Sequence, residues 1–328
     1  MSAGSTTATP FSTTFDIPRK WNVTQIPSQA GKLAVITGAN GGLGLVTARE
    51  LAKAGADVVL AVRDTERGVA AAAEIASAAP QATVEVRQLD LADLGSVRTF
   101  ASQFLLEHDS LDLLINNAGI MATPRRTTAD GFESQLGVNH FGHFALTGLL
   151  LPALVNAPAA RVVTVSSTLH SMGKIAFDDL NSERKYKPYG AYGQSKLANL
   201  LFTAELDRRA TEAGTRVHAY AAHPGYSSTN LQLSGQKGIM RATMAASNTL
   251  FATSPLIGAT PTLCAATLPG LPGGVFVGPR SMGGYRGTPA VAKPHKRAQD
   301  AAVAARLWDA SVTATDVHYD FAASGQRA

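Results

Sequence analysis

The 328-residue sequence predicts an α/β fold in which one doubly wound, parallel sheet of about seven strands carries helices on both faces. Three observations predict this fold. From Lys32 onward, short runs rich in β-branched residues alternate with longer segments of helical periodicity. A glycine-rich turn lies between the first such run and the first helical segment. No change in composition marks a second domain, and 45% hydrophobic residues suffice for one large core.

The expected elements alternate along the chain. The strands are expected at residues 33–37, 57–62, 84–89, 111–116, 161–166, 217–222 and 275–277. The helices are expected at residues 45–54, 65–79, 96–108, 132–155, 192–213 and 257–268. Helix 132–155 contains one acid, Glu133, and no Lys or Arg. We therefore expect this helix either to be buried on all sides or to form a subunit interface.

The ends of the chain and its composition set further limits. Residues 1–30 are rich in Ser, Thr and Pro and are expected to form a flexible arm, residues 31–328 one domain, and 230–256 a lid over the substrate. The net charge of +5 comes from scattered Lys and Arg, so we expect no nucleic-acid partner. Cys264 has no second cysteine for a disulfide or zinc site. No apolar stretch is long enough for a membrane span, and we expect a cytoplasmic location.

The glycine-rich turn at residues 37–44 predicts a dinucleotide site. Gly38, Gly42 and Gly44 allow a tight turn, close approach of the backbone to a pyrophosphate, and close packing of helix on strand. Asn40 and Leu43, between these glycines, belong to the same predicted cofactor site. The strand, turn and helix in this order are typical of a Rossmann domain.

The end of the second expected strand indicates which dinucleotide is bound. Arg63 stands there, where a guanidinium would pair with the 2′-phosphate of NADP(H), so we expect NADP(H) rather than NAD(H). The alternative is that Arg63 only pairs with Asp64 or Glu66 on the surface. Further walls of the cofactor site are expected after the third and fourth strands, at Asp90, Leu91, Asn117, Ala118 and Gly119.

Tyr192 and Lys196 are the candidate proton-transfer pair. They lie four residues apart at the expected start of a helix and so project from one face. An adjacent ammonium and the positive nicotinamide ring would favour the phenolate and lower the tyrosine pKa toward the range that acid–base chemistry on an alcohol needs. Taken alone, the same spacing also fits a solvent-facing pair. The fifth strand ends in two hydroxyls, Ser166 and Ser167, and one of them could hydrogen-bond the substrate oxygen.

Together these motifs resemble the short-chain dehydrogenase/reductase family, and their detail is similar to its retinol-dehydrogenase-like group. The matching pieces run in the family's order from Lys32 to about Thr229. They are Gly38, Gly42 and Gly44, Asp90-Leu91, Asn117-Ala118-Gly119, Asn139, Ser166-Ser167, Tyr192-x-x-x-Lys196 and Pro224-Gly225. Unlike membrane-bound members of that group, the sequence shows no N-terminal apolar anchor.

The resemblance implies a role for each matching residue. Tyr192 would be the acid–base, Lys196 would tune it and hold the nicotinamide ribose, and Ser167 would orient the carbonyl. The backbone carbonyl of Asn139 would hold a relay water beside Lys196. Asn117, Pro224, Ser227 and Thr229 would line the nicotinamide side of the cofactor.

The function that we expect is NADP(H)-dependent hydride transfer to or from a small, lipophilic carbonyl compound or alcohol. The alternatives are an NADPH sensor without turnover and an epimerase that uses hydride transiently. No metal is expected, because His140 and His143 have no third ligand at a recognisable spacing. A homodimer or homotetramer is expected, with helix 132–155 as the subunit contact.

Overall fold

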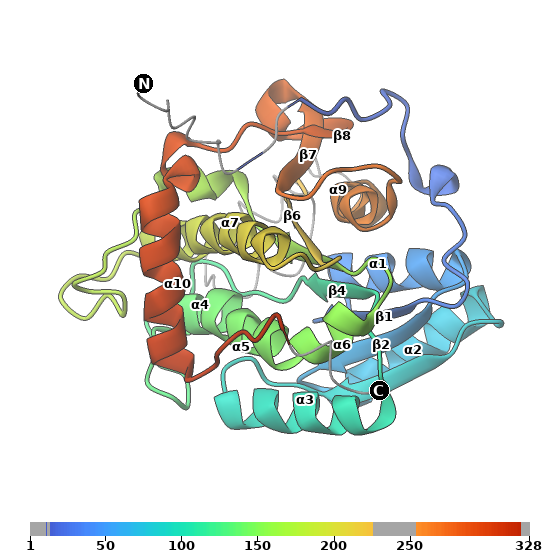
Figure 1. The fold of residues 1–328 in the computed structure, drawn as a ribbon, viewed down its shortest axis with the longest axis horizontal. Helices are drawn as coiled ribbons and strands as arrows, with labels where there is room; N and C mark the ends of the chain where they lie inside the picture. The colour runs from blue at the N-terminus through green and yellow to red at the C-terminus, as the bar shows by residue number, and fades with distance from the viewer. Residues whose placement is uncertain (1–10, 12–13, 226–253, 323–328) are drawn as a thin grey trace, which may run out of the picture.

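A computed structural model of the chain describes residue 11 and residues 14–225 and 254–322 (Figure 1). Its centre is an eight-stranded sheet in the order β3-β2-β1-β4-β5-β6-β7-β8. The strands are β1 (Leu33–Thr37), β2 (Asp57–Val62), β3 (Val84–Gln88), β4 (Leu113–Asn116), β5 (Arg161–Val165), β6 (His218–Ala222), β7 (Val275–Ser281) and β8 (Arg286–Val291). β1 through β7 pair in parallel. The order of strands across the sheet reverses after β3, because β4 pairs with the free side of β1, and this confirms the predicted doubly wound fold.

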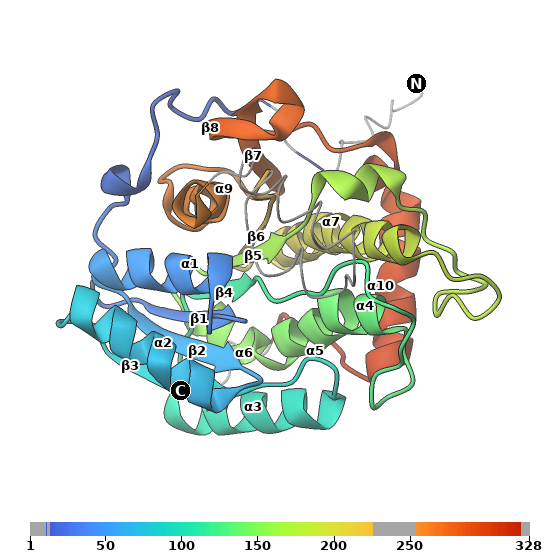
Figure 2. The same cartoon turned by 180° about the vertical axis from the view of Figure 1, so that it is seen from behind.

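Alternate residues of the strands feed two cores, one on each face of the sheet. On one face, Ile36 of β1 and Leu60 of β2 pack against α1 (Gly42–Lys53), α2 (Thr65–Ala78) and α9 (Pro255–Thr267). On the other face, Val35 and Val59 pack against α3 (Leu94–Glu107), α5 (Gly142–Leu149) and α7 (Pro188–Glu212). This arrangement of layers can be followed in Figures 1 and 2. The period of two along each strand therefore explains why both faces carry helices.

The expected helix 132–155 is broken into four pieces. They are α4 (Ser134–Leu136), a π-helical segment (Gly137–Phe141), α5 and α6 (Leu151–Asn156). The junction between α5 and α6 falls at Leu150, just before Pro152 in the first turn of α6. Proline has no N–H to donate and its ring crowds the preceding turn, so one continuous helix is not formed there.

Two C-terminal elements are missing from the sequence prediction. β8 pairs antiparallel with β7, so the prediction of about seven parallel strands falls short by this edge strand. Helix α10 (Ala301–Thr315) packs outside α7 and α5. The Phe144 ring of α5 lies 5.1 Å from Trp308 and 5.0 Å from Tyr319, measured between ring centres.

The packing of α10 decides between the two expectations for segment 132–155. Every residue from Gly142 to Gly148 is buried within the single chain. This part of the segment is therefore buried on all sides, and in this conformation it is not available as the subunit contact expected for a dimer.

The N-terminal segment is not loose over its whole length. Ile17 and Trp21 are fully buried in the core beneath α1 and α9. The Ile17 carbonyl accepts a hydrogen bond from Arg280, and the Arg19 carbonyl accepts one from Thr288, so the segment lies along β7 and β8 (Figure 2). Within the arm expected at residues 1–30, residues 17–21 therefore pack against the domain.

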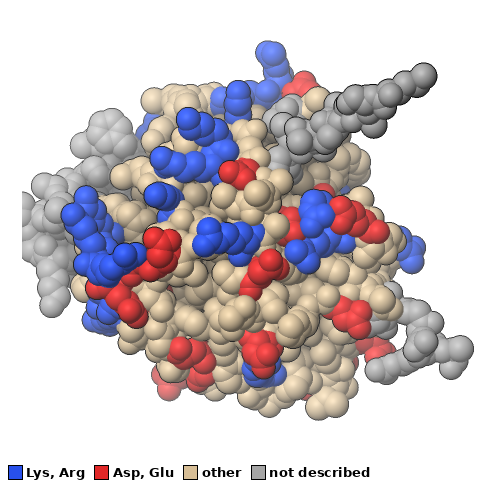
Figure 3. All heavy atoms as spheres, turned by 60° about the vertical axis from the view of Figure 1, so that its left-hand side comes forward, with Lys and Arg blue, Asp and Glu red and all other residues tan. Residues whose placement is uncertain are grey.

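The surface and the helices bear on possible partners. None of the helices in the described part of the chain combines the length and apolar character that a membrane span requires. On the face drawn in Figure 3, basic side chains form several separate groups with acidic side chains among them and do not merge into one stripe.

Candidate active site

The glycine turn between β1 and α1 holds backbone segments in close contact. Gly38 and Gly42 have φ values of +66° and +56°, which L side chains rarely adopt. A Cβ on Gly44 would lie 2.5 Å from the Gly38 carbonyl oxygen, and one on Gly38 would lie 3.0 Å from the Cβ of Ala118. Asn40 and Leu43 are half-buried in the same turn. Larger residues at Gly38 and Gly44 would force the turn open.

The beginning of α1 fits an anionic group. Its N-cap, Gly41, supplies no side-chain hydrogen bond, whereas Asp64 and Asp93 cap α2 and α3 through their carboxylates. The first N–H groups of α1 are therefore free to bind a ligand, and the helix dipole favours a negative charge. No described atom lies within 4 Å of a Cβ built on Gly42, which leaves space for a dinucleotide pyrophosphate.

Two arginines flank this turn. Arg63 follows β2 and is exposed, and neither it nor Arg67 forms an ion pair with any residue that the structure describes. The Arg67 guanidinium lies 3.7 Å from a Cβ built on Gly41. The Asp64 carboxylate accepts the Arg67 backbone N–H at 3.1 Å, so it serves as a helix cap and not as the surface partner considered for Arg63. Both guanidinium groups are available to a phosphate.

The loop after β4 closes over the turn through Thr37. The Thr37 hydroxyl accepts the backbone N–H groups of Asn117 and Ala118, both at 2.9 Å, and the Asn117 side chain donates to the Thr37 carbonyl. After β3, the Asp90 carboxylate accepts the Ala92 N–H. The Leu91 carbonyl would lie 2.5 Å from a Cβ on Gly142. Segments after three strands thus meet at the carboxyl edge of the sheet, where such folds bind ligands.

Tyr192, Lys196 and Ser167 come together at this edge. Tyr192 and Lys196 lie in the first turns of α7, which begins at Pro188 and not at Tyr192 as expected, and both are buried. The Tyr192 phenol lies close enough to Ser167, at the end of β5, for the two side chains to interact. The Lys196 ammonium donates to the Val165 carbonyl at 2.9 Å. Ser166 instead donates to the Lys196 carbonyl, which leaves Ser167 as the serine that faces the phenol.

Burial controls the protonation of this pair. It raises the pKa of the Tyr192 phenol to about 12, and the interaction with Ser167 acts in the opposite direction. It lowers the pKa of Lys196 to about 7. The amine nitrogen lies 5.8 Å from the centre of the tyrosine ring. Desolvation thus favours the neutral form of both groups in the chain itself, and a lowering of the tyrosine pKa by Lys196 together with a positive nicotinamide ring stays a prediction.

Asn139 connects the pair to its surroundings from the π-helical segment. Its side-chain amide donates to Ser195 Oγ at 2.9 Å and its Oδ1 accepts the Ile120 N–H at 2.8 Å. A Cβ on Gly119 would lie 3.0 Å from Asn139 Oδ1 and 3.5 Å from Lys196 Nζ. The Asn139 carbonyl, expected to hold a water, accepts a hydrogen bond from the His143 ring at 3.1 Å.

The last part of the predicted site is only partly described. Pro224 and Gly225 follow β6, and a Cβ on Gly225 would lie 2.5 Å from the Tyr285 carbonyl in the hairpin between β7 and β8. Ser227, Thr229 and residues 230–253 of the expected lid lie outside the described residues.

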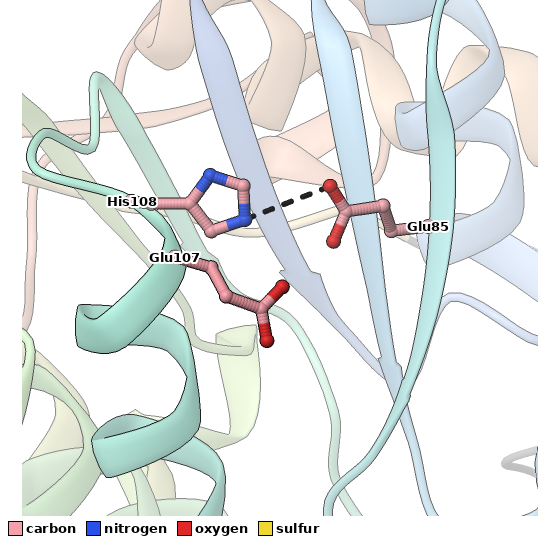
Figure 4. A group of neighbouring side chains, drawn as sticks. All are labelled: Glu85, Glu107 and His108. Atoms are coloured by element: carbon pink, nitrogen blue, oxygen red, sulfur yellow. Dashed lines mark ion pairs between the residues drawn. The ribbon is translucent and has the colours of Figure 1, made fainter.

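The structure also separates residues that could hold a cation. His140 hydrogen-bonds with Ser311 of α10, and His143 hydrogen-bonds with Thr37 of β1. The two rings therefore have partners on different elements and do not share a site. In the described ranges, the group with metal-ligand geometry is Glu85, Glu107 and His108, on β3 and at the end of α3 (Figure 4). Arg87 already lies among them, at 2.6 Å from each carboxylate. This group is therefore an ion-pair cluster.

Three residues with a structural connection to the site are missing from the sequence prediction. Arg67 stands one helical turn after Arg63, a spacing that the sequence displays. Ser195 lies inside the tyrosine–lysine motif and links Asn139 to the Tyr192 carbonyl. His170 has no sequence signal, because its partners are the Ser167 carbonyl at 2.6 Å and the backbone N–H of His295, which is distant in sequence.

Known proteins resemble this chain in sequence and structure. The family model for short chain dehydrogenases matches residues 32–238. Human retinol dehydrogenase 13 is 42% identical over 294 residues, which cover 86% of this chain and 85% of that protein. Mouse retinol dehydrogenase 12 is 54% identical over 201 residues, 61% of this chain and 62% of the relative. The chain therefore spans about three fifths of the length of the retinol dehydrogenases 12 that it matches.

Solved structures agree with these matches. A crystal structure of an uncharacterized protein from Mycobacterium paratuberculosis has 50% identity and a TM-score of 0.77, covering 92% of this chain and 99% of that one. A Beutenbergia cavernae protein, described as an NAD(P)-dependent gluconate 5-dehydrogenase with bound NADP, has 28% identity and a TM-score of 0.56, covering 73% of this chain and 91% of that one. The matched family model covers the glycine turn, Ser167, Tyr192 and Lys196, and so this chain belongs to the short-chain dehydrogenase family.

Proposed function

We propose that this protein is an NADP(H)-dependent oxidoreductase that transfers a hydride between nicotinamide and a carbonyl compound or alcohol. The observation that carries the proposal is the position of the Tyr192 phenol, whose side chain interacts with Ser167 beside Lys196 at the edge of the sheet that holds the glycine turn. A hydroxyl pair can hold one carbonyl oxygen by two hydrogen bonds, which orients the carbonyl carbon for attack.

The protonation state supports the reducing direction. A buried phenol with a pKa of about 12 is neutral at pH 7 and can donate a proton. Bound NADPH would supply the hydride to the carbonyl carbon. Tyr192 then gives its proton to the oxygen as negative charge develops there, and Ser167 stabilises that oxygen by a hydrogen bond. Lys196, with a pKa near 7, can return a proton toward the phenolate.

Arg63 and Arg67 support NADP(H) as the cofactor. Both are free of ion pairs with described residues, and both stand where β2 meets the start of α2, beside the glycine turn. The Asp64 carboxylate, which would repel a 2′-phosphate, caps α2. A ribose-binding acid that would favour NAD(H) is thus replaced at this strand end by two guanidinium groups.

A lipophilic substrate is the class that we propose. Met282 and Tyr285, 70% and 47% exposed, lie in the β7–β8 hairpin next to Gly225. The retinol dehydrogenases to which the chain is similar are named for an apolar alcohol. An apolar hairpin at the carboxyl edge of the sheet fits a substrate that is apolar apart from its carbonyl.

The test is a panel of carbonyl compounds, including all-trans-retinal, aliphatic aldehydes and aromatic ketones, with NADPH or NADH. We expect NADPH oxidation with an apolar carbonyl, and loss of turnover in Tyr192→Phe with NADPH binding retained. The control is Tyr220→Phe, a buried tyrosine whose pKa is also about 12 but whose hydroxyl donates to Leu271, and it should keep turnover.

Other outcomes would favour the alternatives. NADPH binding without oxidation of any panel member would indicate a sensor. Product formed without net NADPH oxidation would indicate an epimerase. Full turnover by Tyr192→Phe would exclude the proposed acid–base role.

A further inference from the structure

His143 lies between the cofactor turn and the catalytic helix. It is 1% exposed in α5. Its Nε2 lies 2.9 Å from the Thr37 hydroxyl at the end of β1, and its Nδ1 lies 3.1 Å from the Asn139 carbonyl. No residue of the proposed chemistry requires a histidine here, so the two contacts call for an explanation.

The partners determine which ring nitrogen carries the proton. A carbonyl oxygen can only accept, so the His143 Nδ1 must be the donor. The Thr37 oxygen already accepts the N–H groups of Asn117 and Ala118, which leaves its own proton to donate. The neutral Nε2 of His143 accepts that proton at the shorter distance, 2.9 Å, whereas the Ile115 carbonyl lies at 3.3 Å. Every polar atom of the ring is thereby satisfied in one tautomer.

A continuous series of hydrogen bonds runs through this ring. On the cofactor side it passes from His143 to Thr37 and on to the backbone of Asn117 and Ala118. On the catalytic side, the Asn139 amide donates to Ser195 Oγ, and Ser195 donates to the Tyr192 carbonyl. The side chains of this series are buried. Buried polar networks with every member satisfied hold one geometry, because breaking any link leaves unpaired groups in the core.

We propose that His143 is a positioning residue that couples the cofactor loop at Asn117–Ala118 to the turn of α7 carrying Tyr192. This inference rests on the proposed dinucleotide site, and it adds a coupling that the proposed chemistry does not specify. Its consequence is that both dinucleotide affinity and turnover depend on a side chain that touches neither cofactor nor substrate.

The same segment contains a matched control. His140, three residues earlier, is also 1% exposed, but its Nε2 bonds to Ser311 of α10. Replacing His140 removes a buried imidazole of equal size without touching Thr37 or the Asn139 carbonyl. A purely structural loss should therefore look alike in the two positions, whereas a positioning effect should appear only at His143.

The experiment compares His143→Phe, His143→Gln and His143→Asn with His140→Phe in the full chain. NADPH and NADH affinity is followed by the fluorescence of the bound nicotinamide, and the melting temperature by circular dichroism. We expect the dissociation constant to rise at least tenfold in His143→Phe and to change less than twofold in His140→Phe, with comparable losses of melting temperature.

The two conservative variants separate the two halves of the series. Glutamine can place its side-chain oxygen near the former position of Nε2, where it accepts the Thr37 hydroxyl proton. The affinity for NADPH should therefore recover while kcat stays low. Asparagine places its amide near the former Nδ1 and can keep the Asn139 bond, so kcat should recover while affinity stays weak. If His143→Phe does not fold, the glutamine and asparagine variants still test the proposal.

The outcomes are distinct. Equal changes of affinity in His143→Phe and His140→Phe, or wild-type affinity in all His143 variants, would overturn the positioning role and leave the proposed function intact. Absence of NADPH and NADH binding by the wild-type chain would overturn the proposed function and this inference together.

Discussion

At the scale of single residues, Arg63 and Asp64 show that adjacent opposite charges need not form an ion pair. Asp64 stands beside Arg63 in the sequence, which invites an ion pair between them. In the structure the Asp64 carboxylate accepts a backbone N–H of α2 and is the N-cap of that helix. Arg63 keeps its five donors for a ligand, and Arg67, one turn further along, adds a second guanidinium.

Replacing either arginine should weaken NADPH binding selectively. A hydrogen bond to a charged group contributes about 1.5–3 kcal/mol, so Arg63→Ala or Arg67→Ala should raise the KM for NADPH by roughly ten- to hundredfold. The KM for NADH, which lacks the phosphate, should stay within about twofold. Steady-state kinetics with both cofactors measures this. Arg49→Ala is the control, since Arg49 pairs with Glu50 and Glu74 on the same side of the fold. Equal changes for NADPH and NADH would contradict the phosphate contact.

At the scale of elements, the segment from Ser134 to Asn156 has a hydrophobic content that favours one long helix and a proline that interrupts it. Its hydrophobic content indicated one long helix, but a π-helical segment and a break before Pro152 divide it. The division places Asn139 and His143 opposite different partners and brings Gly142 against the loop after β3. π-helical segments of this kind are frequent at functional sites.

Gly142→Ala should therefore harm both stability and cofactor binding. The new Cβ would lie 2.5 Å from the Leu91 carbonyl, and this backbone contact can be relieved only by moving α5 or the cofactor wall. Overpacking of this kind costs about 1–3 kcal/mol. Urea denaturation should report that loss, and the dissociation constant for NADPH should rise with it.

The matched variant is Gly190→Ala in the first turn of α7. The nearest atom to its new Cβ is Lys187 Cβ at 3.4 Å, and the position is helical. This change should leave cofactor binding unaltered and raise the free energy of unfolding by about 0.4–1 kcal/mol. If Gly142→Ala were as well tolerated as Gly190→Ala, the close approach of α5 to Leu91 would not matter.

At the scale of the whole molecule, the C-terminal helix takes the place that a second subunit was expected to fill. Trp308 of α10 meets Phe144 edge-on, Tyr319 packs at a tilt against both rings, and Tyr319 donates to the Phe144 carbonyl at 2.6 Å. A Cβ on Gly148 would lie 2.6 Å from both the Tyr319 and Val317 side chains. Any homodimer or homotetramer of this conformation has to use another surface than α5.

Stability should fall steeply in mild acid because three histidines are buried without charge. Burial lowers the pKa of His140 and His143 to about 3 and that of His223 to about 4. In the unfolded chain each titrates near pH 6.5, so below that pH the unfolded chain binds protons that the folded chain does not. The free energy of unfolding should then fall by up to about 1.4 kcal/mol per pH unit for each histidine, and continue to fall down to the folded pKa values.

The melting temperature between pH 7 and pH 5 checks this. His140→Phe should flatten the pH dependence, despite a lower melting temperature at pH 7, because one titrating group is removed. A melting temperature that stays constant from pH 7 to pH 5 would show that the buried histidines do not remain neutral.

The parts that could be predicted from the sequence are those governed by short-range rules. Alternating β-branched runs and helical segments predicted β1 through β7 and the helices that cover them. The glycine turn, Ser167, Tyr192 and Lys196 were predicted because each stands at the end of a strand or on one face of a helix. The edge strand β8 contains Gly287 and Pro289, and because both residue types are unfavourable inside strands, the sequence pattern does not predict it.

Local patterns are enough to predict the doubly wound sheet, the strand ends at which ligands bind and the residue types found there, because period, turn chemistry and spacing act over a few residues. Which groups meet, and in what protonation state, follows from the packing of the whole chain. Burial raises the pKa of the Tyr192 phenol, α10 covers the helix expected to bind a partner, and His143 joins β1 to the π-helical segment. These outcomes depend on contacts between residues far apart in the chain and on the exclusion of water, which no local pattern encodes.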